Sequence, residues 1–335
     1  MKNVLYLILF LIFSIKTFGQ QSEDSEFKRV IPQWFSAWSL VYTDIYKIDE
    51  IQPVQFVFFD DQYVYSTSLV TIPEGISIKG FDLLNLKLNW KKALHHNLIT
   101  LPDKTSVPVK IMSFAAEIPT GQHQAFFVMP LPSFWKKMGI ESKELGLDNL
   151  TTGIFLHEFS HSQQMKNFGK KITQFEKENK SGVEVNDDMI QNIFSKNNIY
   201  VDLYQSEIDH LYNSVTGKEL DRKYLSKGIS LYNERQKTYF KDQYQQLTEM
   251  DDIFLTMEGL GQYSMYRWLI HPQGGKLDEH TALVGVRRNK KWWSQEEGLA
   301  LFLILERIKN PKFWAKGMFG SEMTTAIELI KSKLQ

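Results

Sequence analysis

The sequence predicts an α+β fold, in which a mixed N-terminal region with a β-sheet precedes a mainly helical half. Three observations lead to this prediction. The 335 residues are 43% apolar and 13% aromatic, which is enough to build a sizeable core. Runs of β-branched and aromatic residues dominate residues 54–129, whereas helical periodicity dominates after about residue 145. We therefore expect an N-terminal α+β part over residues 20–148 and a helical part over residues 149–335.

The composition excludes several classes of protein. Basic and acidic residues balance at 39 each, so nothing predicts a nucleic-acid partner. The chain has no Cys, which excludes disulfides, thiol nucleophiles and Cys-ligated metal sites. A metal site would have to consist of His and carboxylate side chains. Because the chain has only eight His, the position of each one is informative.

Residues 1–19 are predicted to be a secretory signal that is removed from the mature protein. Lys2 precedes an apolar run over residues 4–15, and Thr17 and Gly19 supply small side chains before the expected cleavage point. The run is about 12 residues long, too short for a bilayer core that requires roughly 20. We expect a secreted or periplasmic protein with no stable membrane span. A retained N-terminal membrane anchor is the alternative.

The N-terminal part is expected to begin with a helix and to continue with strands. Pro32 is predicted to open the helix, because Trp34, Trp38 and Tyr42 then recur at helical spacing. Two pairs of strands should follow, each pair separated by a turn or an acidic break. These strands are expected over residues 54–59, 63–65, 107–116 and 124–129.

In the helical part, Asp148 or Asn149 can cap a helix over residues 150–167, which Gly169 would end. Ser294 and Glu297 have the spacing of a capping box at the start of a later helix. The further helices are expected over residues 187–197, 199–215, 231–246, 251–270, 294–308 and 321–334.

The first of these helices contains an HExxH motif formed by His157, Glu158 and His161. Four residues advance a helix by about 400°, so both imidazoles project from one face and can share a metal ion. Glu158 can then reach a water in the open coordination position. Zinc would lower the pKa of that water to about 7, and the carboxylate could take its proton during attack on a carbonyl. The alternative is two structural His on a partly buried helix with an exposed Glu.

A zinc site needs a third protein ligand, and Glu258 is the best candidate. The metzincin pattern would require a glycine at position 164 and a histidine at position 167, where this chain has Gln164 and Asn167. Glu258 lies in an apolar helical stretch, in which an unpaired carboxylate would be costly. Gly259 and Gly261 disfavour helix by about 1 kcal/mol each. Their presence makes sense if this helix approaches the HExxH helix closely.

Other acidic residues compete for the third position. Glu176 and Glu178 lie closer to the motif in the sequence, but within a charged run typical of a solvated surface. Glu207 and His210 share one helical face, either as the polar side of an amphipathic helix or as a substrate-facing pair.

HEFSH at residues 157–161, followed by EGLGQY at residues 258–263, resembles the gluzincin branch of the zincin metallopeptidases. The resemblance implies zinc held by His157, His161 and Glu258, with Glu158 as general base. It also implies that a strand just before the first helix, here residues 124–129, pairs with an extended peptide substrate. An ordinary core strand is the alternative for that segment. The long gap between the two motifs is expected to hold an inserted helical subdomain.

The favoured interpretation is a secreted zinc-dependent hydrolase, most simply a peptidase that acts on peptide or protein substrates. A donor must stabilise the oxyanion that forms during such a reaction, and Tyr263, Tyr266 and His210 are the candidates. The alternative function is an inactive zincin-like domain that serves as a binding or surface-interaction module. An intact Glu158 favours the enzyme.

Overall fold

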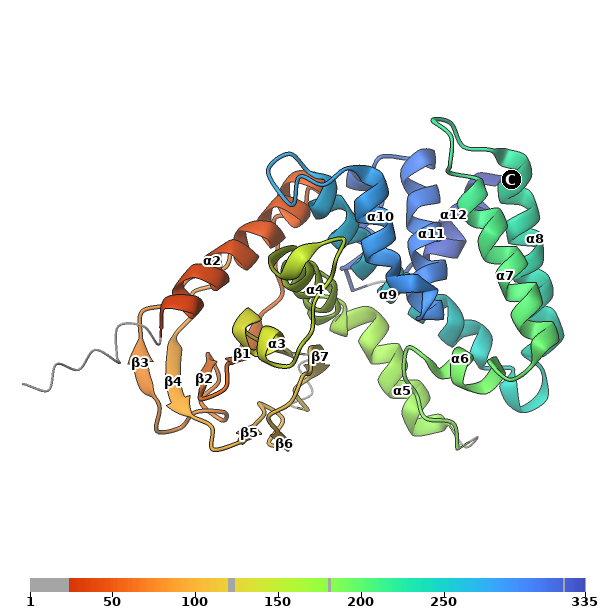
Figure 1. The fold of residues 1–335 in the computed structure, drawn as a ribbon. Helices are drawn as coiled ribbons and strands as arrows, with labels where there is room; N and C mark the ends of the chain where they lie inside the picture. Colours follow the sequence, from red (N-terminus) through yellow and green to blue (C-terminus); the bar gives the residue numbers. More distant parts are fainter. Residues whose placement is uncertain (1–23, 120–123, 180–181, 322, 335) are drawn as a thin grey trace, which may run out of the picture.

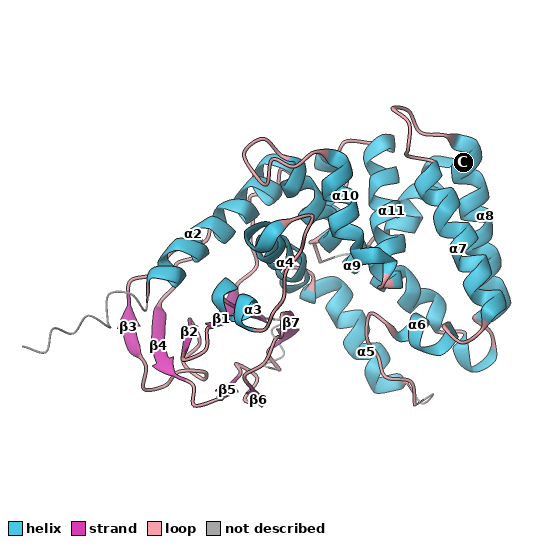
Figure 2. Ribbon diagram, viewed as in Figure 1, coloured by secondary structure: helices cyan, strands magenta, loops and turns pink. Residues whose placement is uncertain are grey.

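The computed structural model describes residues 24–119, 124–179, 182–321 and 323–334. The expected secretory signal lies outside these residues. Figure 1 and Figure 2 show a β-sheet near the N-terminus and a large group of helices that follows it along the chain. This arrangement confirms the predicted α+β class.

The main sheet has six strands in the order β3-β4-β2-β1-β8-β7. The β1 and β8 strands run parallel to each other, and the other neighbouring pairs are antiparallel. A separate ribbon pairs β5 with β6. The strands are β1 (Val54–Phe59), β2 (Tyr63–Ser66), β3 (Ile76–Ile78), β4 (Trp90–Leu94), β5 (Leu98–Thr100), β6 (Ser106–Pro108), β7 (Phe114–Glu117) and β8 (Ala125–Pro130).

The centre of the sheet is apolar on both faces, because successive side chains of a strand point to opposite sides. Phe56 and Phe58 of β1 join the larger core, which the sheet shares with the helices. Val57 and Phe59 join a smaller core on the other face. The strand predicted over residues 107–116 is divided in the structure, since β6 and β7 belong to different sheets.

The helical elements account for most of the described chain (Figure 2). The α-helices are α2 (Ser25–Ser39), α3 (Pro132–Lys137), α4 (Gly146–Ser162), α5 (Lys170–Glu178), α6 (Met189–Phe194), α7 (Asn198–Asn213), α8 (Arg222–Tyr239), α9 (Leu247–Ile270), α10 (Glu279–Arg287), α11 (Trp293–Ile308) and α12 (Ala326–Leu334). The π-helical turns are η1 (Leu40–Ile45) and η2 (Met165–Gly169), and the 3₁₀ turns are η3 (Asp242–Tyr244), η4 (Arg288–Lys290), η5 (Pro311–Phe313) and η6 (Ala315–Met318).

The first helix begins earlier than predicted. Pro32 does not open α2 but lies inside it, where its ring removes one helical hydrogen bond. Phe27, Val30 and Ile31 extend the buried face of the helix on the N-terminal side of Pro32. Their burial explains why the helix persists despite the proline.

The HExxH helix α4 lies at the centre of the molecule, in contact with β7, β8, α2 and α9. It begins at Gly146, close to the boundary predicted at residue 149, and ends at Ser162. A π-helical turn and α5 follow, so Gly169 joins two helical segments instead of terminating one. Because α4 packs against neighbours on several sides, nearly every residue from Leu150 onward is buried.

The contact between α9 and α11 depends on two glycines. A Cβ at Gly259 would come within 2.5–2.6 Å of the backbone of Gly298. Gly259 therefore serves the approach to α11, and the prediction that it serves the approach to α4 was wrong. The predicted capping box is also wrong, because α11 begins one residue earlier. Ser294 makes no side-chain hydrogen bond to a described residue, and Glu297 binds Arg235.

One apolar core joins the sheet, α2 and the helices of the C-terminal half. In the part of the chain that the structure describes, no helix combines the length and apolar character needed to cross a bilayer.

Candidate metal centre

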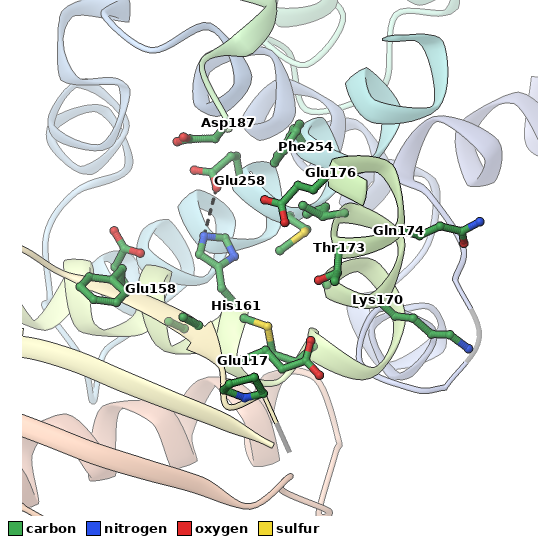
Figure 3. A pocket seen from close by; sticks show the side chains of 18 of the residues that line it. Glu117, Glu158, His161, Lys170, Thr173, Gln174, Glu176, Asp187, Phe254 and Glu258 are labelled. Carbon is green, nitrogen blue, oxygen red and sulfur yellow. Dashed lines mark ion pairs between the residues drawn. The ribbon is translucent and has the colours of Figure 1, made fainter. Parts of the chain in front are cut away.

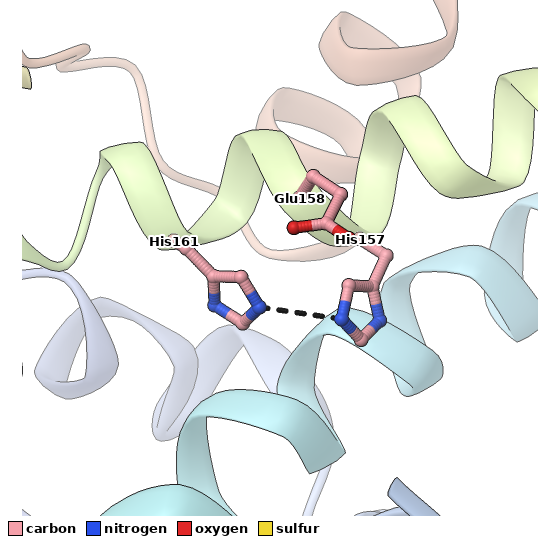
Figure 4. A group of neighbouring side chains, drawn as sticks. All are labelled: His157, Glu158 and His161. Atoms are coloured by element: carbon pink, nitrogen blue, oxygen red, sulfur yellow. Dashed lines mark hydrogen bonds between the residues drawn. The ribbon is translucent and has the colours of Figure 1, made fainter. Parts of the chain in front are cut away.

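The α4 helix places His157 and His161 one turn apart, with the Nε2 atoms of the two rings directed toward each other (Figure 4). Their Nε2 atoms are 3.2 Å apart and the ring centroids 4.9 Å apart. Both side chains are buried, with exposed fractions of 5% and 8%. The helical spacing thus produces the convergence of imidazoles that the motif predicts.

The α9 helix brings the carboxylate of Glu258 to the same point. One oxygen lies 3.1 Å from Nε2 of His157, and the other lies 3.1 Å from Nε2 of His161. Gly261, one turn further along α9, makes this approach feasible. A Cβ at that position would come within 2.6 Å of Nδ1 of His157. For Gly261, the expected close approach to the HExxH helix is therefore observed.

The spacing of the donor atoms fits a metal ion. Tetrahedral coordination with bonds of about 2.0–2.1 Å separates the ligand atoms by about 3.3–3.4 Å. The two imidazole nitrogens and the Glu258 oxygens are separated by 3.1–3.2 Å. His157, Glu158 and His161 also form a compact potential metal-binding group, with one ligand atom of each residue within 4.8 Å of the others. The group can hold a metal ion.

Two glutamines support these side chains from outside the cluster. Gln164 Oε1 lies 3.4 Å from Nδ1 of His161, while the Gln164 amide donates to the carbonyl oxygen of Met318. With Nδ1–H as the donor, the Nε2 lone pair of His161 faces the metal position. Gln295, on α11, donates from Nε2 to an oxygen of Glu258 at 3.1 Å.

The charges of the cluster depend on one another. Burial would raise the pKa of Glu258, but His161 and His157 outweigh burial and hold it well below its usual range. Burial opposes the charging of His161, yet the Glu258 carboxylate raises its pKa to about 9. Burial lowers the pKa of His157. In the metal-free protein at neutral pH, Glu258 and protonated His161 therefore form an ion pair beside a neutral His157.

Glu158 is half-buried on the next position of α4 and faces a cleft (Figure 3). Burial raises the pKa of its carboxyl group to about 8, and the charge of Glu258 adds to this effect. A carboxyl group with this pKa can accept or release a proton near pH 8, which general acid–base chemistry requires.

The cleft has a volume of about 1060 Å³ and also contains His161 and Glu258. Residues 113–117, which include β7, line one side, and α5 lines another. The β7 strand is the last in the sheet, and within the described chain no strand pairs with its outer edge. The strand expected to bind substrate, residues 124–129, is instead β8, which pairs with β1 on one side and β7 on the other. The expectation of a substrate-binding edge strand was wrong and its alternative, an ordinary core strand, is confirmed, because β8 lies between β1 and β7 in the sheet.

The other acidic candidates for the third ligand position lie away from the two imidazoles. Glu207 is fully buried and its carboxylate binds the guanidinium of Arg235, with 2.7 Å between Nε and Oε2. Glu176 is exposed on α5 and lines the cleft, and Glu178 is exposed at the end of that helix. The ligand position beside the two imidazoles is occupied by Glu258.

The structure does not bring the candidate oxyanion donors into the cleft. The Tyr263 hydroxyl lies 3.4 Å from a guanidinium nitrogen of Arg267, within the aromatic core. Tyr266 lines a different cavity between α9, α10 and α11. His210 lies on α7, where Nδ1 contacts the carbonyl oxygen of Ser206 at 2.6 Å. None of these three side chains is among the residues that line the cleft.

Sequence reasoning missed Gln164, Gln295 and Asp187. Asp187 lines the cleft, and burial together with the charges of Glu258 and Asp188 raises its pKa to about 7. Gln164 lies three residues after His161, so its position one turn along could have drawn attention to it. For Gln295 and Asp187 the sequence carries no such indication, because long-range packing places them here.

Comparison with protein-family models, with curated proteins and with solved structures gave no match for this chain.

Proposed function

We propose that this protein is a secreted zinc-dependent peptidase of the gluzincin type. The observation that carries the proposal is the convergence of His157, His161 and Glu258 beside Glu158, at the wall of a cleft that β7 borders. The expected secretory signal at residues 1–19 supports the location outside the cytoplasm.

Zinc is the metal that the donor set favours. Two imidazoles and one carboxylate are one of the usual ligand sets of catalytic zinc, and three protein ligands leave one coordination position for water or substrate. When bound, zinc polarises a substrate carbonyl and lowers the pKa of a coordinated water to about 7.

Glu158 is proposed as the general base. It follows His157 directly in α4, and its carboxylate lies within 4.8 Å of the ligand atoms of His157 and His161, whereas Glu258 contacts both imidazoles at 3.1 Å. Glu158 would take a proton from the attacking water and return it to the leaving nitrogen of the peptide. A nearby cation would favour the ionised form of this carboxyl group, which burial otherwise disfavours.

The edge of β7 supports a peptide as the substrate. A strand edge offers backbone donors and acceptors that an extended peptide can satisfy by adding a strand. Phe114, Ala115 and Ala116 of this strand line the same cleft as His161 and Glu258. A peptide bound along this edge would therefore pass close to the metal centre.

Digestion of a mixed peptide library, analysed by mass spectrometry, tests the proposal. The purified protein should cleave peptides, should lose this activity after dialysis against a chelator, and should regain it when Zn²⁺ is added. Stoichiometric zinc without any cleavage would instead favour the inactive binding module. Cleavage that resists the chelator would contradict a zinc mechanism.

A further inference from the structure

The Glu258 carboxylate receives a hydrogen bond from a side chain outside the cleft. Gln295 Nε2 lies 3.1 Å from Oε2 of Glu258, the oxygen that also contacts His157. Gln295 itself is not among the residues that line the cleft. Among the described residues, Gln295 therefore contacts the cluster through the carboxylate of Glu258.

The packing of two helices produces this contact. Gly298 lies one turn after Gln295 on α11, and Gly259 follows Glu258 directly on α9. At this crossing the two backbones approach so closely that a Cβ at either glycine would contact the other helix at 2.6 Å or less. The crossing holds the first turn of α11 against Glu258, which fixes the position from which Gln295 reaches the carboxylate.

The orientation of the Gln295 amide is also fixed. Gln262, one turn after Glu258 on α9, donates from its amide nitrogen to Oε1 of Gln295. An ionised carboxylate can only accept hydrogen bonds, so Gln295 must present its NH₂ group to Glu258. Gln262 Oε1 is left buried without a hydrogen-bond partner among the described residues. If the Gln262 amide were turned over, its Oε1 would face Oε1 of Gln295, and two acceptors would be in contact. The unpaired Oε1 of Gln262 is tolerated because it avoids that contact.

We propose that Gln295 is a positioning residue for the metal centre: it holds the carboxylate of Glu258 toward the two imidazoles and so raises the affinity for the metal. This inference rests on the proposed zinc site. Groups that do not bind the metal but orient its ligands through hydrogen bonds typically contribute about 10-fold to 100-fold in metal affinity.

Substitution of Gln295 tests the proposal through metal binding, without any assay of activity. Gln295→Leu keeps a similar volume and removes the donor, whereas Gln295→Asn keeps an amide that is too short to reach Glu258. Ser294→Ala is the matched control, because Ser294 neighbours Gln295 on α11 and its hydroxyl has no hydrogen-bond partner among the described residues. Zn²⁺ affinity is measured by competition with a chromophoric chelator, the site geometry by the visible spectrum of bound Co²⁺, and folding by the Tm of the metal-free proteins.

Both Gln295 variants should bind Zn²⁺ about 10-fold to 100-fold more weakly than the wild type and should shift the Co²⁺ spectrum. Ser294→Ala should change neither property, and all metal-free Tm values should stay close to that of the wild type. Zn²⁺ affinities within threefold of the wild type, with an unchanged Co²⁺ spectrum, would overturn the role of Gln295 and leave the zinc site standing. A wild-type protein that binds neither ion would overturn the zinc site itself.

Discussion

At the scale of single residues, the metal centre is a set of coupled charges. A metal ion requires the neutral form of each imidazole, but Glu258 keeps His161 protonated up to a pH of about 9 in the metal-free protein. Metal binding must therefore displace a proton from His161. Glu158, whose pKa is raised to about 8 by burial, can release a further proton when a cation arrives.

We accordingly predict that the apparent affinity for Zn²⁺ rises with pH. Below the pKa of His161, each bound metal displaces about one proton or more, so the affinity should increase at least about tenfold per pH unit between pH 6 and pH 8. Isothermal titration calorimetry in buffers of different ionisation enthalpy measures the protons released. An affinity independent of pH in this range would show that His161 is already neutral without metal.

A second prediction at this scale concerns Glu158. Glu158→Gln leaves His157, His161 and Glu258 untouched, so the variant should retain its metal. The chemical step should slow by at least about a hundredfold, because the proposed general base is lost. Zinc content and the rate of peptide cleavage, measured on the same preparation, check both parts. Unchanged turnover would remove Glu158 from the mechanism.

The residues of this site differ in how far the sequence could reveal them. His157, Glu158 and His161 could be found because they lie within five residues, and helical geometry alone sets their relation. Glu258 could be proposed because a carboxylate in an apolar helix needs a partner. Gln295 contacts Glu258 across 37 residues of sequence, through a helix crossing that no local pattern specifies.

At the scale of elements, the distance between α4 and α9 decides whether the ligands meet. Gly261 permits the approach, since an added Cβ would lie 2.6 Å from Nδ1 of His157. Gly259 serves a different contact, with Gly298 of α11. The sequence shows that both glycines are unusual within a helix, but the choice of neighbouring helix depends on tertiary packing.

We predict that Gly261→Ala displaces the His157 imidazole. The variant should bind Zn²⁺ at least about tenfold more weakly and lose about 1–3 kcal/mol of stability through overpacking. Gly317→Ala is the control, because an added Cβ there meets no atom within 4 Å. Zinc competition and denaturant unfolding of both variants provide the measurements. Equal zinc affinity in Gly261→Ala and the wild type would show that α9 can move without disturbing the ligands.

The sheet shows a similar limit of sequence reasoning. Within the predicted segment 124–129, residues 125–129 are continuously apolar, which predicts a strand correctly and is typical of a strand buried on both faces. Its position between β1 and β7 follows from the strand order of the sheet. The periodicity of a single strand does not predict that order. The edge beside the cleft therefore belongs to β7. This short strand and β6 were predicted as one continuous strand.

At the scale of the whole molecule, a buried charge network ties the helices of the C-terminal half together. Arg235 of α8 binds Glu207 of α7, Asp251 of α9 and Glu297 of α11, and its side chain is fully buried. Burial raises the pKa of Glu297 well above its usual range. The carboxylates of Glu207 and Asp251, which share the same guanidinium, raise it further. These contacts connect the helices between the HExxH motif and Glu258 to the helix that carries Glu258. Helical periodicity predicts these helices, but no local pattern indicates that their acidic residues share Arg235.

We predict that Arg235→Met lowers the stability of the fold by about 3–5 kcal/mol, because it leaves buried carboxylates without their counter-charge. Arg222→Met, at the exposed start of the same helix, should change stability little. Thermal unfolding of both variants between pH 4 and pH 8 measures the difference. The loss in Arg235→Met should shrink as the pH falls, because burial raises the pKa values of Asp251 and Glu297 and their protonation removes the unpaired charge. A loss that grows toward acid pH would contradict this explanation.

The central claim is that His157, His161 and Glu258 together hold a metal ion. The most direct test is the zinc content of purified wild-type protein, Glu258→Ala and Glu176→Ala after equilibration with Zn²⁺ and gel filtration. Glu176 lines the same cleft but lies outside the converging ligands, so it controls for the loss of a nearby acidic side chain. The account predicts about one equivalent of zinc in the wild type and in Glu176→Ala, and little in Glu258→Ala. Full zinc occupancy in Glu258→Ala would contradict it.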